Sequence, residues 1–324
     1  KAGVPVPYAP NTNRINHAGG LAADGSYVAI VAGWDGKTKP AGWEPNPLVK
    51  EDDLDASEGL NSLHPVPAVS RDGGHTWKQF APVIADDNAQ VGGNTLMPYG
   101  RIAPLPDGKL GVMMYRGMAT AFFYTSGDGG KTWQKRGLVV DGNQTSEPAW
   151  LRLENGDLYA AVRHDLGNRS PIGIGGINAY RSTDGGRTWK GEGALTLAGQ
   201  QPGDLTRLPD GRILLTYGVR NEGDRGINAR VGDAEARIWS YPIRLVDNEG
   251  ATDEPNLPQS KRDNGYPSTV VLGDGTLVTV YYSRGMPGHH RYHVGVVRWG
   301  LPATTKKNHT VNETKQWLSL QQIV

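Results

Sequence analysis

The sequence predicts an all-β protein, a β-propeller of four-stranded antiparallel blades, and three observations lead to this fold. Glycine supplies 45 of the 324 residues, about twice its usual share, which disfavours long helices and favours tight turns. An octapeptide with the pattern S-x-D-G-G-x-T-W occurs three times. Short apolar stretches, paired around Asp-Gly or Asn-Gly turns, stand between its copies. Repeats of this size indicate an architecture in which similar units stack side by side.

The octapeptide is interpreted as a structural turn. Its copies begin at Ser70, Ser126 and Ser182, and their aspartates are separated by 56 residues in both intervals. In each copy the aspartate and two glycines are expected to form a hairpin turn whose carboxylate accepts backbone N–H bonds, while the tryptophan packs between neighbouring units. A fourth, decayed copy at residues 232–239 ends in tryptophan but has Ala234 in place of the aspartate.

Five hairpins complete the repeating unit. Their turn residues are Asp24, Asp107, Asn155, Asp210 and Asp274, each followed by glycine and flanked by β formers. From the second hairpin on they recur every 48 to 64 residues, and each is followed by a third strand, the octapeptide turn and a fourth strand. This order describes a four-stranded blade. We expect one domain over residues 1–324, with repeats at about 12–299 and a tail or closing strand at 300–324.

Charge and residue usage exclude several classes of protein. The 34 Lys and Arg residues against 33 Asp and Glu residues give a net charge of +1, which argues against a nucleic-acid or membrane-surface protein held by bulk charge. The absence of cysteine excludes a disulfide framework, zinc ribbons and thiol catalysis. No apolar run is long enough for a membrane span, and the chain opens at Lys1 rather than Met, which suggests that a signal peptide has been removed. We expect a secreted or periplasmic protein and, as a separate expectation, a monomer. The histidines at 289–293 lack Cys or Asp partners at ligand spacing, so we expect no metal and no other cofactor.

Equal offsets from the hairpin turns identify the residues at one central rim, because the first strand of every blade begins where the second strand ends. Eight residues before the turns stand Asn16, Tyr99, Glu147, Pro202 and Tyr266. Four of the five second strands end in arginine, namely Arg116, Arg163, Arg220 and Arg284, and the remaining one ends at Trp34 and Asp35. Guanidinium groups that converge on one rim predict an anionic ligand, a carboxylate or a sulfate. The alternative is that each arginine pairs with a neighbouring Asp or Glu or reaches solvent.

The octapeptide is the Asp-box, and over residues 12–299 the chain resembles the sialidase superfamily of Asp-box propellers. This resemblance implies six blades, although five hairpins can be counted. Arg14 with Ile15 is similar to the Arg-Ile opening of the F/Y-R-I-P motif of these enzymes, although Asn16 and His17 replace the Pro and the residue after it. Asp35 stands where sialidases keep their acid/base aspartate.

Two further stretches carry the resemblance. Residues 147–163 are similar to the stretch with the catalytic glutamate and the second carboxylate-binding arginine, which implies these roles for Glu147 and Arg163. Residues 265–268 resemble the stretch with the nucleophilic tyrosine, which implies that role for Tyr266. Arg220 or Arg225 would be the third arginine, and its shared register with Arg163 favours Arg220.

These residue types suit a sugar with a carboxylate on its anomeric carbon. A carboxylate nucleophile would approach such a sugar against like-charge repulsion, whereas a neutral tyrosine hydroxyl, deprotonated by a nearby glutamate, avoids that cost. The arginines would hold the substrate carboxylate, and Asp35 would protonate the leaving oxygen and then activate water. We therefore expect a sialidase-like exo-glycoside hydrolase, a retaining enzyme that removes a terminal acidic sugar from a glycan or acidic polysaccharide.

Two other functions are compatible with the residues predicted at this rim. His17, His64 and His164 lie near predicted rim positions. With Tyr99 or Tyr266 they could form the proton-transfer site of a lyase on uronate-containing polysaccharides, or of a His-dependent glycosidase. The third alternative is a glycan-binding propeller without catalytic activity.

Overall fold

The computed structural model describes residues 12–35, 61–84, 96–117, 119–142, 144–165, 175–248, 263–284 and 292–301. Within these ranges nineteen β-strands follow one another along the chain. The described residues contain no helix that is long and apolar enough to cross a membrane. The expected all-β class is therefore confirmed.

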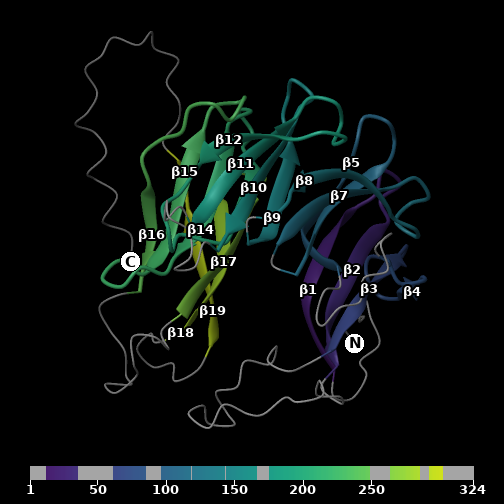
Figure 1. Ribbon diagram of the computed structural model, residues 1–324. Coiled ribbons are helices and arrows are strands. Elements are labelled where there is room, and N and C mark those ends of the chain that lie inside the picture. Colours follow the sequence, from purple (N-terminus) through teal and green to yellow (C-terminus); the bar gives the residue numbers. More distant parts are fainter. Residues whose placement is uncertain are drawn as a thin grey trace.

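The strands group into five antiparallel units, here called blades 1 to 5, which follow one another in chain order from purple to yellow (Figure 1). Blade 1 contains β1 (Thr12–Leu21), β2 (Tyr27–Asp35), β3 (Asn61–Ser70) and β4 (Lys78–Gln79). Blade 2 contains β5 (Leu96–Pro104), β6 (Leu110–Arg116), β7 (Thr120–Ser126) and β8 (Gln134–Val140). Blade 3 contains β9 (Thr145–Arg152), β10 (Leu158–His164), β11 (Gly176–Ser182) and β12 (Lys190–Ala194). Blade 4 contains β13 (Gly203–Arg207), β14 (Ile213–Val219), β15 (Gly226–Gly232) and β16 (Ile243–Asp247), and blade 5 contains β17 (Asp263–Val271), β18 (Leu277–Arg284) and β19 (His293–Trp299).

The first strands of neighbouring blades contact one another. β1 and β5 pair in parallel at residues 18–20 and 100–102, so that blades 1 and 2 form one eight-stranded sheet. Between blades 2 and 3, Nε1 of Trp150 donates a hydrogen bond of 3.0 Å to the carbonyl oxygen of Arg101. Between blades 4 and 5, the Thr206 hydroxyl donates one of 3.0 Å to the carbonyl oxygen of Thr269. The first strands therefore lie at the inner side of the arrangement.

The four-stranded antiparallel blade is confirmed in blades 1 to 4, whereas blade 5 has three strands among the described residues. The long interval between the first two hairpins holds β3, β4 and the first Asp-box. The described strands do not close into a ring, so six blades stay a prediction. Residues 302–324, most of the expected tail, lie outside the described residues.

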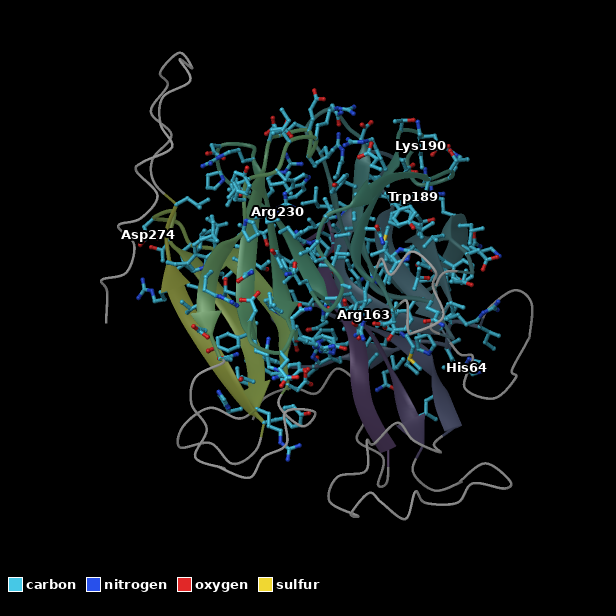
Figure 2. The ribbon with its side chains drawn as sticks, turned by 60° about the vertical axis from the view of Figure 1, so that its left-hand side comes forward. His64, Arg163, Trp189, Lys190, Arg230 and Asp274 are labelled. Carbon is cyan, nitrogen blue, oxygen red and sulfur yellow. The ribbon has the colours of Figure 1, made fainter. Side chains whose placement is uncertain are left out.

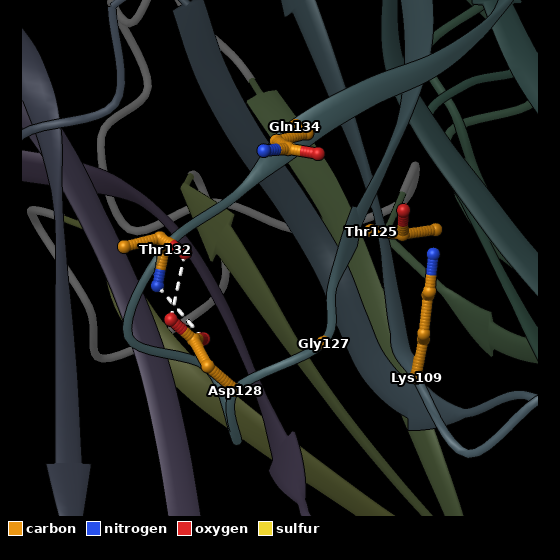
Figure 3. Close-up of a pocket in the computed structure, with 6 residues that line it drawn as sticks. All are labelled: Lys109, Thr125, Gly127, Asp128, Thr132 and Gln134. Atoms are coloured by element: carbon orange, nitrogen blue, oxygen red, sulfur yellow. Dashed lines mark hydrogen bonds between the residues drawn. The ribbon is translucent and has the colours of Figure 1, made fainter.

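Each Asp-box is a turn organised by its aspartate. In the second box the Asp128 carboxylate accepts hydrogen bonds from the backbone N–H of Thr132 at 3.0 Å and from its hydroxyl at 2.7 Å (Figure 3). Gly129 and Gly130 follow with φ angles of 77° and 90°, in the left-handed region that favours glycine. Nε1 of Trp133 then donates to the carbonyl oxygen of Gly130 at 3.0 Å. The aspartates are therefore occupied in the turn, as expected for a structural role.

The decayed fourth box keeps this turn with a different aspartate. The carboxylate of Asp233, one residue before Ala234, accepts hydrogen bonds from the backbone N–H groups of Arg237 at 2.7 Å and Ile238 at 3.2 Å. Ala236 takes a φ of 55°, and Nε1 of Trp239 donates to its carbonyl oxygen at 3.1 Å. A search for the exact octapeptide pattern does not find Asp233, because the aspartate stands one position earlier than in the other boxes.

The Asp-box tryptophans pack between blades. The ring of Trp189, which follows β11 of blade 3, lies 5.7 Å from the ring of Phe123 in β7 of blade 2. Phe123 is completely buried and also contacts Trp150 at 5.0 Å. This aromatic cluster holds blades 2 and 3 at the Asp-box end and leaves the opposite end for the predicted rim.

Candidate active site

The predicted rim lies at the end of the sheets away from the Asp-boxes. Figure 2 shows Trp189 of an Asp-box and Asp274 of a hairpin turn toward the upper end, with Arg163 below them. Arg163 lies near the end of β10, away from the hairpin turn, where β10 pairs with the beginning of β9. The offsets counted along the sequence therefore identify residues of one end of the molecule.

The centre of the site is a hydrogen-bonded pair, Tyr266 of β17 and Glu147 of β9. The Tyr266 hydroxyl donates to Oε1 of Glu147. The other carboxylate oxygen, Oε2, accepts a hydrogen bond of 2.7 Å from Nη1 of Arg163. Glu147 is 6 % exposed whereas Tyr266 is 39 % exposed, so the carboxylate is enclosed while the tyrosine is accessible from solvent.

Glu147 and Tyr266 share a backbone conformation that is unusual for residues with a side chain. Their φ angles are 44° and 48°, in the left-handed region, where such a residue costs of order 1–2 kcal/mol. Each lies at an irregularity in the pairing of its strand with the next one, and each precedes a proline. A bulge of this kind re-aims a side chain out of the regular alternation, and here it turns both residues toward each other.

Burial and the negative charge of Glu147 keep Tyr266 protonated. Burial raises the pKa of the Tyr266 hydroxyl well above its ordinary value, and the negative charge of Glu147 and the hydrogen bond to it act in the same direction. The guanidinium groups of Arg163 and Arg220 oppose this shift without cancelling it. Tyr266 is therefore a neutral hydroxyl beside a carboxylate at neutral pH.

Arg163 connects two carboxylates. Besides Glu147, it contacts Asp165, whose Oδ2 lies 2.9 Å from Nε of Arg163. Asp165 in turn accepts a hydrogen bond of 2.9 Å from Nε2 of Gln201. Although burial lowers the pKa of Arg163, the charges of Glu147 and Asp165 raise it more, so the guanidinium stays charged.

Arg220 lies over the ring of Tyr266. Its guanidinium carbon is 5.8 Å from the centre of the Tyr266 ring. Nε of Arg220 lies 3.2 Å from Oδ1 of Asp263, and Nη2 donates to the Tyr282 hydroxyl at 2.9 Å. Burial lowers the pKa of Arg220, but Tyr282 and Asp263 raise it more.

Each of these two arginines keeps one terminal amino group for a ligand. Arg163 uses Nε and Nη1 for the protein, and Arg220 uses Nε and Nη2. In the described part of the chain, Nη2 of Arg163 and Nη1 of Arg220 make no hydrogen bond, and neither atom is enclosed. Two charged N–H donors near Tyr266 are thus not used by the described part of the protein.

The remaining predicted site residues are placed as follows. Tyr99 joins the site, with its ring 6.3 Å from that of Tyr266, and burial raises the pKa of its hydroxyl well above the ordinary value. Arg284 lies over the ring of Tyr292, which contacts Tyr282 at 5.5 Å, so it stands at the edge of the site. Arg116 lies over Phe122 of its own blade.

His164 points away from Arg163, as alternation along β10 requires. It is 4 % exposed, and its Nε2 lies 3.1 Å from the Tyr180 hydroxyl. His17 is exposed on β1, and His64 is partly buried on β3. Arg14 lies in β1, and Asp35 ends β2 opposite Thr12, but their side chains are outside what the structure describes.

Three residues of the site were not predicted, Asp165, Asp263 and Tyr282. For Asp165 and Tyr282 the signal that could have identified them is strand alternation, because residues two apart on a strand share a face. Asp165 follows Arg163 by two residues, and Tyr282 precedes Arg284 by two. In the described ranges, no group of three or more His, Asp or Glu side chains is arranged to hold a metal ion.

Comparisons with known proteins agree with this fold. Residues 46–279 match the family described as BNR repeat-like domain. A Dyadobacter fermentans protein described as of unknown function has a similar structure, with a TM-score of 0.66 and 23 % sequence identity over 90 % of this chain and 77 % of that one. A search of the curated proteins found no match.

Two solved glycosidase structures are also similar. A Hadza microbial sialidase gives a TM-score of 0.58 at 20 % identity over 90 % of this chain and 53 % of the sialidase, so the chain spans about half of that enzyme. An α-L-arabinofuranosidase of Fusarium graminearum in complex with arabinobiose gives 0.57 at 16 % identity over 91 % of this chain and 84 % of that one. At these identities the likeness concerns the fold.

Proposed function

The chain belongs to the BNR repeat-like family of the sialidase superfamily, and we propose that it is a retaining exo-glycoside hydrolase that removes a terminal acidic sugar. The observation that carries this proposal is the hydrogen bond from Tyr266 to Glu147, whose second oxygen is bound by Arg163. This arrangement provides a neutral nucleophile, a base in contact with it and a cation beside both.

The first step forms a bond between the Tyr266 oxygen and the anomeric carbon of the sugar. As that bond forms, the hydroxyl proton passes to Oε1 of Glu147, which already accepts its hydrogen bond. The glycosidic C–O bond breaks, and the leaving oxygen takes a proton from the acid, the role proposed for Asp35. In the second step water attacks the anomeric carbon and gives one proton to the base, the role proposed for Asp35. The bond between that carbon and the tyrosine oxygen breaks, and Glu147 returns the proton to Tyr266.

The raised pKa of Tyr266 is compatible with this chemistry because no free phenolate has to form. The proton moves to Oε1 of Glu147 while the C–O bond is made, and Arg163 binds the other carboxylate oxygen at 2.7 Å. A neutral nucleophile also suits an anionic sugar, because the carboxylate of the sugar would repel a negatively charged nucleophile as it approached the anomeric carbon.

The substrate carboxylate is proposed to bind between Nη2 of Arg163 and Nη1 of Arg220. Each charge-assisted hydrogen bond contributes roughly 1.5–3 kcal/mol. The described site holds three carboxylates, Glu147, Asp165 and Asp263, against these two guanidinium groups. Recognition of an anion therefore rests on directed N–H donors rather than on a net positive potential.

The lyase alternative is not favoured by the position of the histidines. His164 contacts Tyr180 on the other face of β10, so it does not face Tyr266. Of the three histidines predicted near the rim, His164 is thus hydrogen-bonded to Tyr180.

The test is hydrolysis of a fluorogenic aryl sialoside by the purified protein, with an aryl arabinofuranoside and a uronate polysaccharide assayed in parallel. Release of the fluorophore from the sialoside, lost in Tyr266→Phe and in Arg163→Ala, would support the proposal. Formation of an unsaturated uronate chromophore would replace it with a lyase, and binding of glycans without turnover would leave a binding module.

A further inference from the structure

A second tyrosine–carboxylate pair lies next to the first, and the mechanism above does not use it. The ring of Tyr282 in β18 is 5.5 Å from the ring of Tyr266. The Tyr282 hydroxyl donates a hydrogen bond of 2.5 Å to Oδ2 of Asp263 and accepts one of 2.9 Å from Nη2 of Arg220. Its proton and one lone pair are thus both committed, which leaves it unsuited to attack a sugar.

The pair holds Arg220 from one side. Nε of Arg220 donates to the carbonyl oxygen of Asn264 at 3.1 Å and lies 3.2 Å from Oδ1 of Asp263. Together with the bond from Nη2 to Tyr282, these contacts occupy one edge of the planar guanidinium. Because the group is planar, fixing Nε and Nη2 also fixes the direction of Nη1.

The groups that hold Arg220 belong to one β-hairpin, formed by β17 and β18. Asp263 and Asn264 lie on β17 together with Tyr266, and Tyr282 lies on β18 opposite Gly265 in the strand register. The same hairpin therefore carries the proposed nucleophile and the groups that orient the cation beside it. Arg220 itself follows β14 of blade 4, so this contact also fixes blade 4 relative to blade 5 at the site.

We propose that Tyr282 is a positioning residue, which with Asp263 orients the Arg220 guanidinium so that Nη1 receives one oxygen of the substrate carboxylate. This inference rests on the proposed function for the identity of the ligand. A long, flexible side chain that is already ordered loses less conformational freedom on binding. The contacts of Tyr282 and Asp263 with Arg220 therefore strengthen binding of the acidic sugar. Tyr282 does not take part in proton transfer.

The chain offers a matched pair of variants. Tyr282→Phe removes the bridging hydroxyl and keeps the ring against Tyr266. Tyr281→Phe is the control, because Tyr281 is the preceding residue on β18, is 8 % exposed and faces the other side of the sheet, near Gly295. Thermal unfolding of both variants shows whether either change disturbs the fold.

With an acidic glycoside as substrate, Tyr282→Phe is expected to raise KM about tenfold and leave kcat within about threefold, the pattern of lost uniform binding. Asp263→Asn should shift KM in the same direction, and Tyr281→Phe should leave both constants unchanged. An unchanged KM for Tyr282→Phe, or a loss of kcat without a change in KM, would overturn the assignment.

A second measurement does not depend on turnover. In protein labelled with ¹⁵N-arginine, NMR of ligand-free samples reports rotation of the Arg220 guanidinium, assigned with Arg220→Lys. Rotation should be slow in the wild type and in Tyr281→Phe, and faster in Tyr282→Phe. Equal rotation in all three would show that Tyr282 does not orient Arg220. If rotation changes as expected but no acidic glycoside is hydrolysed, the proposed function is wrong while the orienting contact stands.

Discussion

Tyr266 and Glu147 lie 119 residues apart in the chain, yet they share a hydrogen bond and the same left-handed backbone conformation. Both stand at the same distance before their hairpin turns, in the first strands of blades 5 and 3. The repeat thus places two equivalent positions of different blades face to face, and different side chains at those positions make a nucleophile and its base.

The first prediction concerns Tyr266. Tyr266→Phe should lower kcat on an acidic aryl glycoside by about a thousandfold or more, because the nucleophilic oxygen is lost while the ring contacts with Tyr99 and Tyr282 stay. Initial rates and thermal unfolding, measured on the same samples, separate loss of chemistry from loss of fold. Turnover at the wild-type level would contradict the role of Tyr266.

Glu147→Gln should lower kcat by about 10²–10⁴, the usual range for removal of a general base. The amide cannot take the Tyr266 proton, although it keeps the shape of the side chain. Glu154→Gln is a matched control, because Glu154 lies in the hairpin turn of the same blade and pairs with Arg207 at 3.5 Å on the surface. Equal kcat values for the two variants would argue against a base at Glu147.

Arg220→Ala should raise KM for the acidic glycoside by about 10–100-fold, since one charge-assisted bond contributes roughly 1.5–3 kcal/mol. The comparison is Arg237→Ala, which removes an exposed arginine paired with Glu235 in the turn between β15 and β16. Michaelis constants are measured for both. A KM that responds equally to both substitutions would show that net charge, rather than the Arg220 donor, binds the substrate.

Alkaline pH should destabilise the fold through tyrosines whose pKa is raised in the folded protein. The pKa of Tyr266 and that of Tyr282 are raised above the ordinary value of 10.0, chiefly by burial. Above this pH the unfolded chain has released protons that the folded chain still holds, so the free energy of unfolding falls as pH rises. Chemical denaturation at increasing pH should show this fall, and Tyr282→Phe should make it shallower. The same raised pKa implies that ionisation of Tyr266 does not limit activity below about pH 10.

Trp189→Ala tests the packing between blades. Removing a large aromatic side chain from its contact with Phe123 should lower the free energy of unfolding by roughly 3 kcal/mol. Residual activity per folded molecule should stay at the wild-type value, because the cluster lies at the Asp-box end. Denaturation midpoints and rates for the same preparation give both quantities, and a large loss of specific activity would show that the two ends are coupled.

Local chemistry explains why the sheets could be predicted. An aspartate followed by two glycines forms the same turn wherever it occurs, as the bonds of Asp128 to Thr132 illustrate. Turn position also sets hairpin register, so counting from each turn identified Glu147, Arg163, Arg220 and Tyr266 as residues of one rim. The decayed box shows the limit of this method, because Asp233 performs the same task one position away from the pattern.

The sequence by itself determined the hairpins, their turns and the strand positions that lie at the rim. Only the tertiary structure decided which of them meet. Arg163 joins Glu147 while Arg116, at the equivalent position, stays over Phe122, and His164 turns to Tyr180. Asp263 and Tyr282 enter the site through Arg220, a residue of another blade. The physical reason is that hairpin geometry is set within about ten residues, whereas contacts at the rim depend on how separate sheets pack against one another.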